Sequence, residues 1–196
     1  FINGKMKKIL IVGANGMLGF DLVQTFQELG YEVQGATRQD FDVTKIEEIA
    51  NFFHDKSFDL VINSTAYTQV DKAEEEKDLA FAINEKGAEN LAKITNQKNI
   101  PIIYISTDYV FDGTKQEPYE IDDKTNPINV YGASKLAGEI ATRKANPQSY
   151  IVRTSWLYGK NGKNFVSTML ELSKTRTELN VVNDQFGCPT WTVGLA

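Results

Sequence analysis

Two residues four positions apart could perform acid–base chemistry on a carbonyl group. The stretch V-Y-G-A-S-K-L, residues 130–136, places Tyr131 and Lys135 on one face of a predicted helix. A free phenol has a pKa of about 10, which is too high for efficient proton exchange at neutral pH. A neighbouring ammonium group favours the phenolate, so we expect Lys135 to lower the pKa of Tyr131. The pair is a candidate proton donor with a positive charge beside it.

Two hydroxyl groups that could bind the same carbonyl follow a predicted strand. Ser106 and Thr107 stand at the end of the apolar run 102–106, in Y-I-S-T-D-Y-V-F-D-G. Ligands bind at the carboxyl ends of parallel strands, so a hydroxyl here can hydrogen-bond a substrate carbonyl beside Tyr131. A Tyr-x-x-x-Lys pair alone is common on solvated helix faces, and the strand-end hydroxyl is what favours a functional interpretation.

A glycine-rich turn follows the first predicted strand. The motif G-A-N-G-M-L-G contains Gly13, Gly16 and Gly19 between a strand and a helix. In a dinucleotide-binding turn, the first glycine makes the bend and the second lets backbone N–H groups approach a pyrophosphate. The third lets the helix pack closely on the strand. A second predicted strand begins about twenty residues later, as this fold requires, so we expect a nicotinamide dinucleotide whose ribose Lys135 can hydrogen-bond.

The end of the second predicted strand bears on the choice between NADH and NADPH. An acidic residue there would accept hydrogen bonds from the ribose of NADH, but this chain has Thr37 and Arg38. A guanidinium group suits the 2′-phosphate of NADPH. A plain surface role for Arg38 is the alternative, and Asp40 or Asp42 could still hold a ribose or adenine. We therefore predict NADPH as the preferred cofactor, with NADH as the second candidate.

The elements that must position these residues alternate in type along the chain. Apolar runs typical of strands occupy residues 9–12, 32–36, 60–63, 102–106 and 150–153. Helical patterns occupy residues 18–29, 45–54, 71–97 and 131–144. Strands that are apolar on both faces indicate a parallel sheet covered by helices on both sides. We predict an α/β fold in which residues 1–154 form a doubly wound Rossmann domain. Residues 155–196 would begin a smaller substrate-binding region interleaved with it.

Composition excludes several classes of site and partner. The 196-residue chain has a net charge of −5 with scattered acidic residues, which argues against a nucleic-acid or membrane surface. Cys188 is the only cysteine, so the chain cannot form an internal disulfide, which favours the cytoplasm. With His54 as the only histidine, a Cys/His zinc site is excluded as well. We expect His54 to be a solvated helix residue and leave a need for Mg²⁺ open. Residues 1–5 precede the first methionine; a non-native remnant is one interpretation, and they are left out of the fold argument.

The motifs taken together resemble those of the extended short-chain dehydrogenase/reductases, and within them the dTDP-4-dehydrorhamnose reductase family. The similarity runs from Met6 almost to the final residue. Its specific marks are the glycine turn, N-S-T-A-Y-T-Q-V-D-K-A-E, Y-I-S-T-D-Y-V-F-D-G, N-V-Y-G-A-S-K-L-A-G-E, V-R-T-S-W-L-Y-G and N-D-Q-F-G-C-P-T.

The resemblance implies a role for each of several residues. Tyr131 would be the catalytic acid, Lys135 its partner, and Thr107 the hydroxyl that orients and polarises a sugar ketone. Asp108 and Trp156 would meet the nucleotide sugar, although a core tryptophan is the alternative for Trp156. The residues implied to contact the cofactor are Gly13, Asn15, Gly16, Met17, Leu18, Gly19, Arg38, Asp42, Val43, Ala66, Tyr67, Thr68, Tyr131 and Lys135. For Asp71, Lys72 and Glu74 to Glu76 we expect only a solvated helix start.

The implied activity is NADPH-dependent reduction of the 4-keto group of dTDP-4-dehydro-L-rhamnose to dTDP-L-rhamnose, for polysaccharide synthesis. The implied protein is a monomer or homodimer whose partner is a nucleotide sugar. A nucleotide-sugar epimerase of the same superfamily and a non-catalytic, NADP-binding regulatory subunit are the alternatives. A dehydratase typically has an Asp-Glu pair after the strand-end Thr, whereas Tyr109 follows Asp108 here. The family's remaining substrate-domain segment does not follow T-V-G-L-A, so we expect a truncated chain that binds NADPH but turns over poorly.

Overall fold

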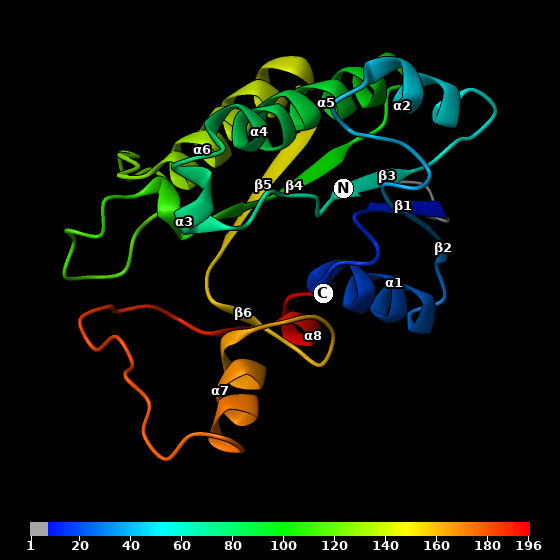
Figure 1. Cartoon of the computed structure of the whole chain (residues 1–196). Coiled ribbons are helices and arrows are strands. Elements are labelled where there is room, and N and C mark those ends of the chain that lie inside the picture. Colours follow the sequence, from blue (N-terminus) through cyan, green and yellow to red (C-terminus); the bar gives the residue numbers. More distant parts are fainter. Residues whose placement is uncertain (1–7) are drawn as a thin grey trace.

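One parallel sheet of five strands forms the centre of the chain (Figure 1). The computed structural model describes residues 8–196, so the interpretation of residues 1–5 lies outside the described part. The strand order is β2-β1-β3-β4-β5. The strands are β1 Lys8–Val12, β2 Glu32–Ala36, β3 Leu60–Asn63, β4 Ile102–Thr107 and β5 Ser149–Thr154. Each lies within one residue of its predicted bounds, and the predicted doubly wound α/β fold is confirmed.

Helices cover both faces of this sheet because its central strands are apolar on both sides (Figure 1). Leu10 and Val12 of β1 pack on one face, in a cluster with Phe53 of α2 (Ile46–Phe53) and residues of α5 (Ala88–Gln97). The alternate residues Ile9 and Ile11 pack on the other face, against α1 (Met17–Glu28). The four β1 side chains are at most 1% exposed. The period-two alternation of β1 therefore supplies two separate cores from one strand.

The segment predicted as one helix over residues 71–97 is interrupted. It consists of α3 Val70–Ala73, α4 Lys77–Phe81, the π-helix η1 Ala82–Gly87, and α5. Between α3 and α4, the Glu74 carboxylate accepts a hydrogen bond of 2.8 Å from the backbone N–H of Val130. The Glu76 carboxylate accepts one of 2.8 Å from the Tyr67 hydroxyl. Glu74 is exposed, as predicted for a solvated helix start, and Glu76 is half-buried. Both glutamates also bind groups from other segments, which the prediction did not include.

The residues after β5 form a second, smaller group of elements. Thr154, where the boundary between the two predicted regions was placed, is the last residue of β5. The following elements are β6 Leu157–Tyr158, α7 Phe165–Ser173, β7 Thr190–Trp191 and α8 Thr192–Leu195. Strands β6 and β7 pair in parallel, and Leu195 of α8 packs in the α1 cluster. Helix α7 and the stretch after it extend away from the sheet (Figure 1), and α7 has no buried residue.

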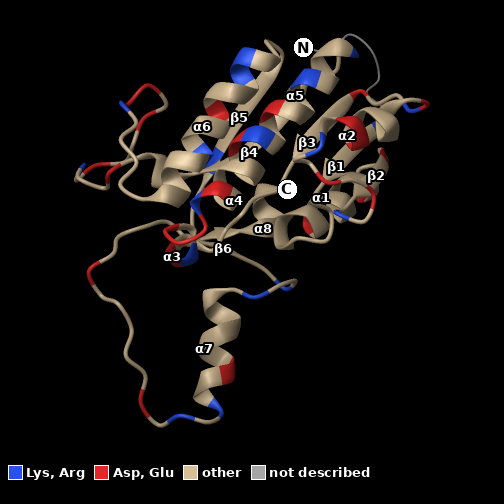
Figure 2. Ribbon diagram, turned by 45° about the horizontal axis from the view of Figure 1, so that its top comes forward, with Lys and Arg blue, Asp and Glu red and all other residues tan. Residues whose placement is uncertain are grey.

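Charges of both signs are interspersed along the helices and loops (Figure 2). Within residues 8–196, no helix combines the length and apolar character needed to span a bilayer. In the same range, no three His, Cys, Asp or Glu side chains gather so that they could hold a metal ion. His54 lies exposed at the end of α2 beside Asp55, as predicted.

The glycine turn brings the start of α1 against the end of β1. Gly13 has a φ of +85°, which side-chain-bearing residues rarely adopt. A Cβ atom added to Gly19 would lie 2.1 Å from the carbonyl oxygen of Gly13. Only glycine at position 19 allows this approach of helix and turn.

We expect Gly19→Ala to destabilise the protein by about 1–3 kcal/mol, because the clash is with backbone that cannot move aside cheaply. Thermal unfolding followed by circular dichroism measures the change. Gly194→Ala is the matched control, since the nearest atom to its added Cβ is 3.6 Å away. Equal melting temperatures for the two variants would contradict this reading of the turn.

Candidate active site

A cavity lies where the order of the strands reverses. The chain passes from β1 to β2 on one side and then returns to β3 on the other side of β1. In open α/β sheets, ligands bind in the crevice at such a switch point. The cavity has a volume of about 460 Å³ and collects residues from the carboxyl ends of β1, β3, β4 and β5. Its lining includes these predicted site residues: Gly16, Met17, Leu18, Gly19, Ala66, Thr68, Thr107, Asp108, Tyr131, Lys135 and Trp156.

The start of α1 forms one side of the cavity. Gly16 is the N-cap residue, and within the described part of the chain no side chain caps the first turn. The first helical bond runs from Phe20 N–H to Gly16, so the N–H groups of Met17 to Gly19 have no partner within the helix. Because these donors lie at the positive end of the helix dipole, this side of the cavity suits a phosphate group.

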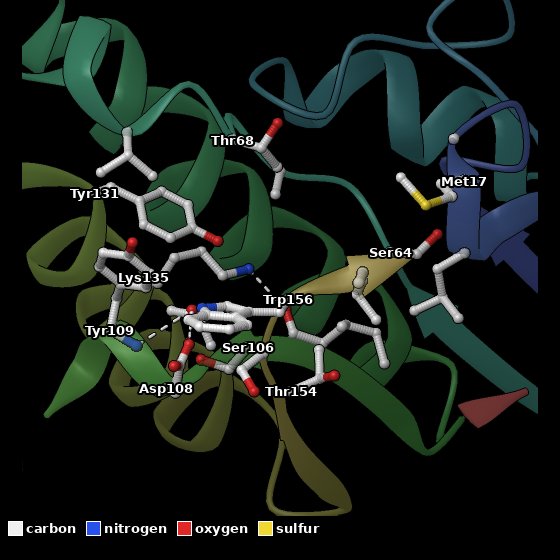
Figure 3. Close-up of a pocket in the computed structure, with 18 of the residues that line it drawn as sticks. Met17, Ser64, Thr68, Ser106, Asp108, Tyr109, Tyr131, Lys135, Thr154 and Trp156 are labelled. Carbon is white, nitrogen blue, oxygen red and sulfur yellow. Dashed lines mark hydrogen bonds between the residues drawn. The ribbon is translucent and has the colours of Figure 1, made fainter. Parts of the chain in front are cut away.

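Tyr131 and Lys135 lie on the opposite side from Met17 and Ser64 (Figure 3). Both residues belong to α6 (Val130–Ala145), which begins with Asn129 accepting a hydrogen bond from Gly132 N–H. The Lys135 side chain is almost fully buried, at 2% residue exposure. Its ammonium group donates a 2.6 Å hydrogen bond to the carbonyl of Ile105. It also lies 4.1 Å from the centre of the Tyr104 ring, in a cation–π contact.

Burial moves the pKa values of this pair in opposite senses. It lowers the pKa of Lys135 to about 7, with Glu139 acting in the opposite direction. It raises the pKa of Tyr131 to about 12, while the Thr107 hydroxyl lowers it and Asp108 raises it further. The pKa of Tyr131 is therefore raised overall and not lowered as predicted, because burial is the largest effect and the Lys135 ammonium is bonded to Ile105. The phenol is therefore protonated at neutral pH, the state that a proton donor needs.

The two candidate hydroxyls at the end of β4 have different surroundings. Ser106 donates a 2.6 Å hydrogen bond to the carboxylate of Glu139. Thr107, which is 5% exposed, donates to Asp108 at 3.1 Å and accepts from the Tyr109 N–H at 3.2 Å. Both hydroxyl protons thus have a carboxylate acceptor, and Thr107 is the better candidate to bind a carbonyl because its hydroxyl also interacts with the Tyr131 phenol. Burial raises the pKa of Asp108 beside it.

Trp156 forms a further wall of the cavity (Figure 3). The residue is 43% exposed, so the alternative of a core tryptophan was wrong. Its φ of +46° lies in the left-handed region, which is rare for a bulky residue and marks a constrained position. A Cβ added to Gly187 would lie 2.6 Å from the indole ring. The absence of a side chain at position 187 thus leaves room for the indole.

Six predicted site residues do not line this cavity: Gly13, Asn15, Arg38, Asp42, Val43 and Tyr67. The Arg38 side chain is 84% exposed, with one nitrogen 3.5 Å from the Asp42 carboxylate. Asp42 accepts two hydrogen bonds from Thr44, and the backbone bond is the largest cause that lowers its pKa. Val43 packs in the core, and Tyr67 is turned toward Glu76.

Several lining residues were missed from the sequence: Ser64, Val70, Ile105, Tyr109, Thr154, Ser155, Leu157, Gly162 and Lys163. Ser64, Thr154 and Ser155 directly follow or end strands, so the strand-end rule could have found them. Tyr109 packs edge-on against Tyr131, with ring centres 5.6 Å apart. Lys163 comes from the segment after β6, for which no local pattern predicts a place at the cavity.

Comparison with known proteins places this geometry in a family. Residues 6–196 match the family model described as RmlD substrate binding domain. A dTDP-4-dehydrorhamnose reductase of Sinorhizobium fredii is 44% identical over 93% of this chain and 62% of its own length. The spore coat polysaccharide biosynthesis protein SpsK of Bacillus subtilis is 42% identical over 97% of this chain and 68% of its own length.

A solved structure shares the fold closely. The crystal structure of dTDP-4-dehydrorhamnose reductase from Bacillus anthracis in complex with NADP superposes with a TM-score of 0.94 and 42% identity. The superposition covers 97% of this chain and 68% of that protein. The chain thus spans between 62% and 68% of the length of the three relatives. Because the family model matches residues 6–196 and the fold is shared, the chain belongs to the RmlD family, which includes proteins named dTDP-4-dehydrorhamnose reductase.

Proposed function

We propose that the protein is an NADPH-dependent reductase of a 4-keto nucleotide sugar, with dTDP-4-dehydro-L-rhamnose as the substrate and dTDP-L-rhamnose as the product. The observation that carries the proposal is the meeting of Tyr131, Lys135 and Thr107 at one cavity whose far side is the uncapped start of α1. In this proposal, residues 1–154 bind the cofactor and residues 155–196 contribute to the sugar site.

The residues present fit a nicotinamide dinucleotide. The start of α1 lines the cavity, and its N–H groups from Met17 to Gly19 have no partner within the helix, so they could bind a diphosphate. Ala66 and Thr68, after β3, and Lys135 of α6 would face the rest of the dinucleotide, because they line the same cavity. When bound, NADPH supplies the hydride that a ketone reduction needs.

The chain's own residues have distinct tasks in the proposed reaction. The Thr107 hydroxyl would hydrogen-bond the ketone oxygen and hold the sugar in place. Tyr131, whose phenol is protonated, would donate its proton to the oxygen as negative charge develops there. Lys135 would stabilise the phenolate that remains, since its ammonium lies on the same side of the cavity. Trp156 offers a flat apolar wall for a sugar or thymine ring.

We expect Tyr131→Phe to lower kcat by about 10²- to 10⁴-fold, because it removes the proton donor and little volume. NADPH affinity, measured by quenching of its fluorescence, should change less than about threefold. The assay uses the protein encoded by the complete gene. Tyr109→Phe, which changes the neighbouring ring in the same way, is the control and should keep most of the activity. A Tyr131→Phe enzyme with normal kcat would refute the assignment.

We expect Arg38→Ala to weaken NADPH binding by about tenfold and to leave NADH binding unchanged. The reason is that a guanidinium group pairs with the 2′-phosphate that only NADPH carries. The exposed arginine of α6, Arg143, is the control for loss of one positive charge. Titration of each variant with both dinucleotides measures the effect. Equal losses for NADH and NADPH would contradict the proposed contact.

The ratio of NADPH consumed to sugar converted separates the proposed reductase from the two alternatives. A reductase consumes one NADPH for each product molecule, so we expect a ratio of about one when a panel of 4-keto nucleotide sugars is assayed. An epimerase converts sugar without net consumption of NADPH. A regulatory subunit binds NADPH and converts none of the sugars.

A further inference from the structure

Glu139 is a buried carboxylate that the proposed chemistry does not use. It lies on α6 and is only 3% exposed. A charged carboxylate at such a depth is costly unless it is paired and hydrogen-bonded. Its position along the helix is also informative, because Tyr131, Lys135 and Glu139 follow one another at intervals of four residues and share one face.

Three hydrogen bonds fix this carboxylate. Arg153 of β5 donates from Nε to Oε1 at 2.9 Å and from Nη2 to Oε2 at 2.7 Å, in the bidentate geometry of a strong ion pair. Ser106 of β4 donates a third bond, to Oε1, at 2.6 Å. Ser106 and Arg153 are partners in the register of the two strands, as are Thr107 and Thr154. One side chain of α6 therefore ties the helix to β4 and β5 at the strand ends that line the cavity.

Arg153, the other member of this ion pair, is held in place by aromatic rings. The Arg153 guanidinium lies 5.0 Å from the centre of the Phe111 ring, which stacks on Tyr119 at 4.0 Å. Arginine is suited to this position because its planar group can pair and stack at the same time. The pair thus has fixed geometry at both the helix and the sheet.

The surroundings of Lys135 give Glu139 an electrostatic role as well. The titratable and charged groups on the elements packed around Lys135 are Tyr131 and Glu139 of α6, Tyr104 of β4, Arg153 of β5, and Asp108 with Tyr109 of η2 (Asp108–Val110). Burial favours the neutral form of the amine and lowers its pKa, while Glu139 favours the ammonium. Glu139 therefore counteracts the effect of burial on Lys135.

We propose that Glu139 and Arg153 are a positioning pair that fixes α6 against the ends of β4 and β5, and that Glu139 in addition favours the ammonium form of Lys135 beside Tyr131. The inference rests on the proposed function in so far as it predicts turnover. Its prediction for the charge of Lys135 does not depend on any substrate.

The test is a titration of Lys135 by NMR in protein labelled with ¹³C at the lysine ε position, with Lys135→Met used to assign its signal. Wild-type Lys135 should titrate near 7. Glu139→Gln should move the midpoint to lower pH. The variant Glu139→Met/Arg153→Met avoids leaving one buried charge unpaired, and it should lower the midpoint by less, because it also removes the positive charge of Arg153. The controls are Glu171→Gln and Arg143→Met, at exposed positions on α7 and α6; neither should move the midpoint.

Turnover is then measured with the protein encoded by the complete gene. We expect both Glu139 variants to lose about tenfold or more in kcat, because a small displacement of reacting groups is costly. The alkaline limb of the kcat profile should shift to lower pH, and the KM for NADPH should stay within about twofold. Arg153→Lys, which keeps the charge, should recover part of the loss seen in Arg153→Met.

The outcomes separate the inference from the proposed function. A folded Glu139→Gln variant with the wild-type Lys135 midpoint and wild-type kcat would overturn the inference and leave the reductase proposal standing. A midpoint that falls in a protein that reduces none of the sugars would support the charge-holding role and refute the reductase proposal. Loss of thermal stability alone, with an unchanged midpoint and pH profile, would show that the pair is only structural.

Discussion

The backbone of helix α6 is in direct contact with η1, with β4 and with η2, which follows β4. This close packing determines where the reactive side chains lie. A Cβ added to Gly138 would lie 2.1 Å from the carbonyl oxygen of Asn84 and 2.4 Å from the Tyr104 hydroxyl. A Cβ added to Gly132 would lie 2.1 Å from the carbonyl oxygen of Tyr109. Since both glycines flank Lys135 on the helix, any residue with a side chain at either position would push the helix away from Thr107. Close-packed interiors transmit such shifts instead of absorbing them.

The same packing sets the protonation states of the site. Pressing Lys135 against Tyr104 and Ile105 removes water from the ammonium, and partial burial of Tyr131 disfavours its phenolate. Environments that move two pKa values apart are a general means of assigning acid and base roles. Here they give a phenol that keeps its proton and an amine that titrates close to neutral pH. The chemistry of the pair follows more from exclusion of water than from the attraction between the two side chains.

Local patterns predicted the strands, the glycine turn and the Tyr131 helix, because each depends on neighbours within a few residues. Patterns of this kind could not predict the break between residues 73 and 77, since the partner of Glu74 is Val130, 56 residues away. The same reason explains why Ser106 was taken for a substrate ligand: its acceptor, Glu139, is 33 residues away. The pKa of Tyr131 was misjudged because burial is a property of the whole fold. Resemblance to a family supplied Trp156 and Asp108, which no spacing rule would have chosen.

The contact between Gly187 and Trp156 has a consequence for sequence variation. Gly187 lies in an exposed stretch, where most positions tolerate change because they touch little. Its neighbour is the indole wall of the cavity, at a distance that leaves no room for even a methyl group. The constraint on the shape of the cavity therefore extends to a residue that does not line it. In a family alignment, position 187 should vary as little as the residues of the cavity itself. Neighbouring positions such as Phe186, at 98% exposure, should accept many residue types.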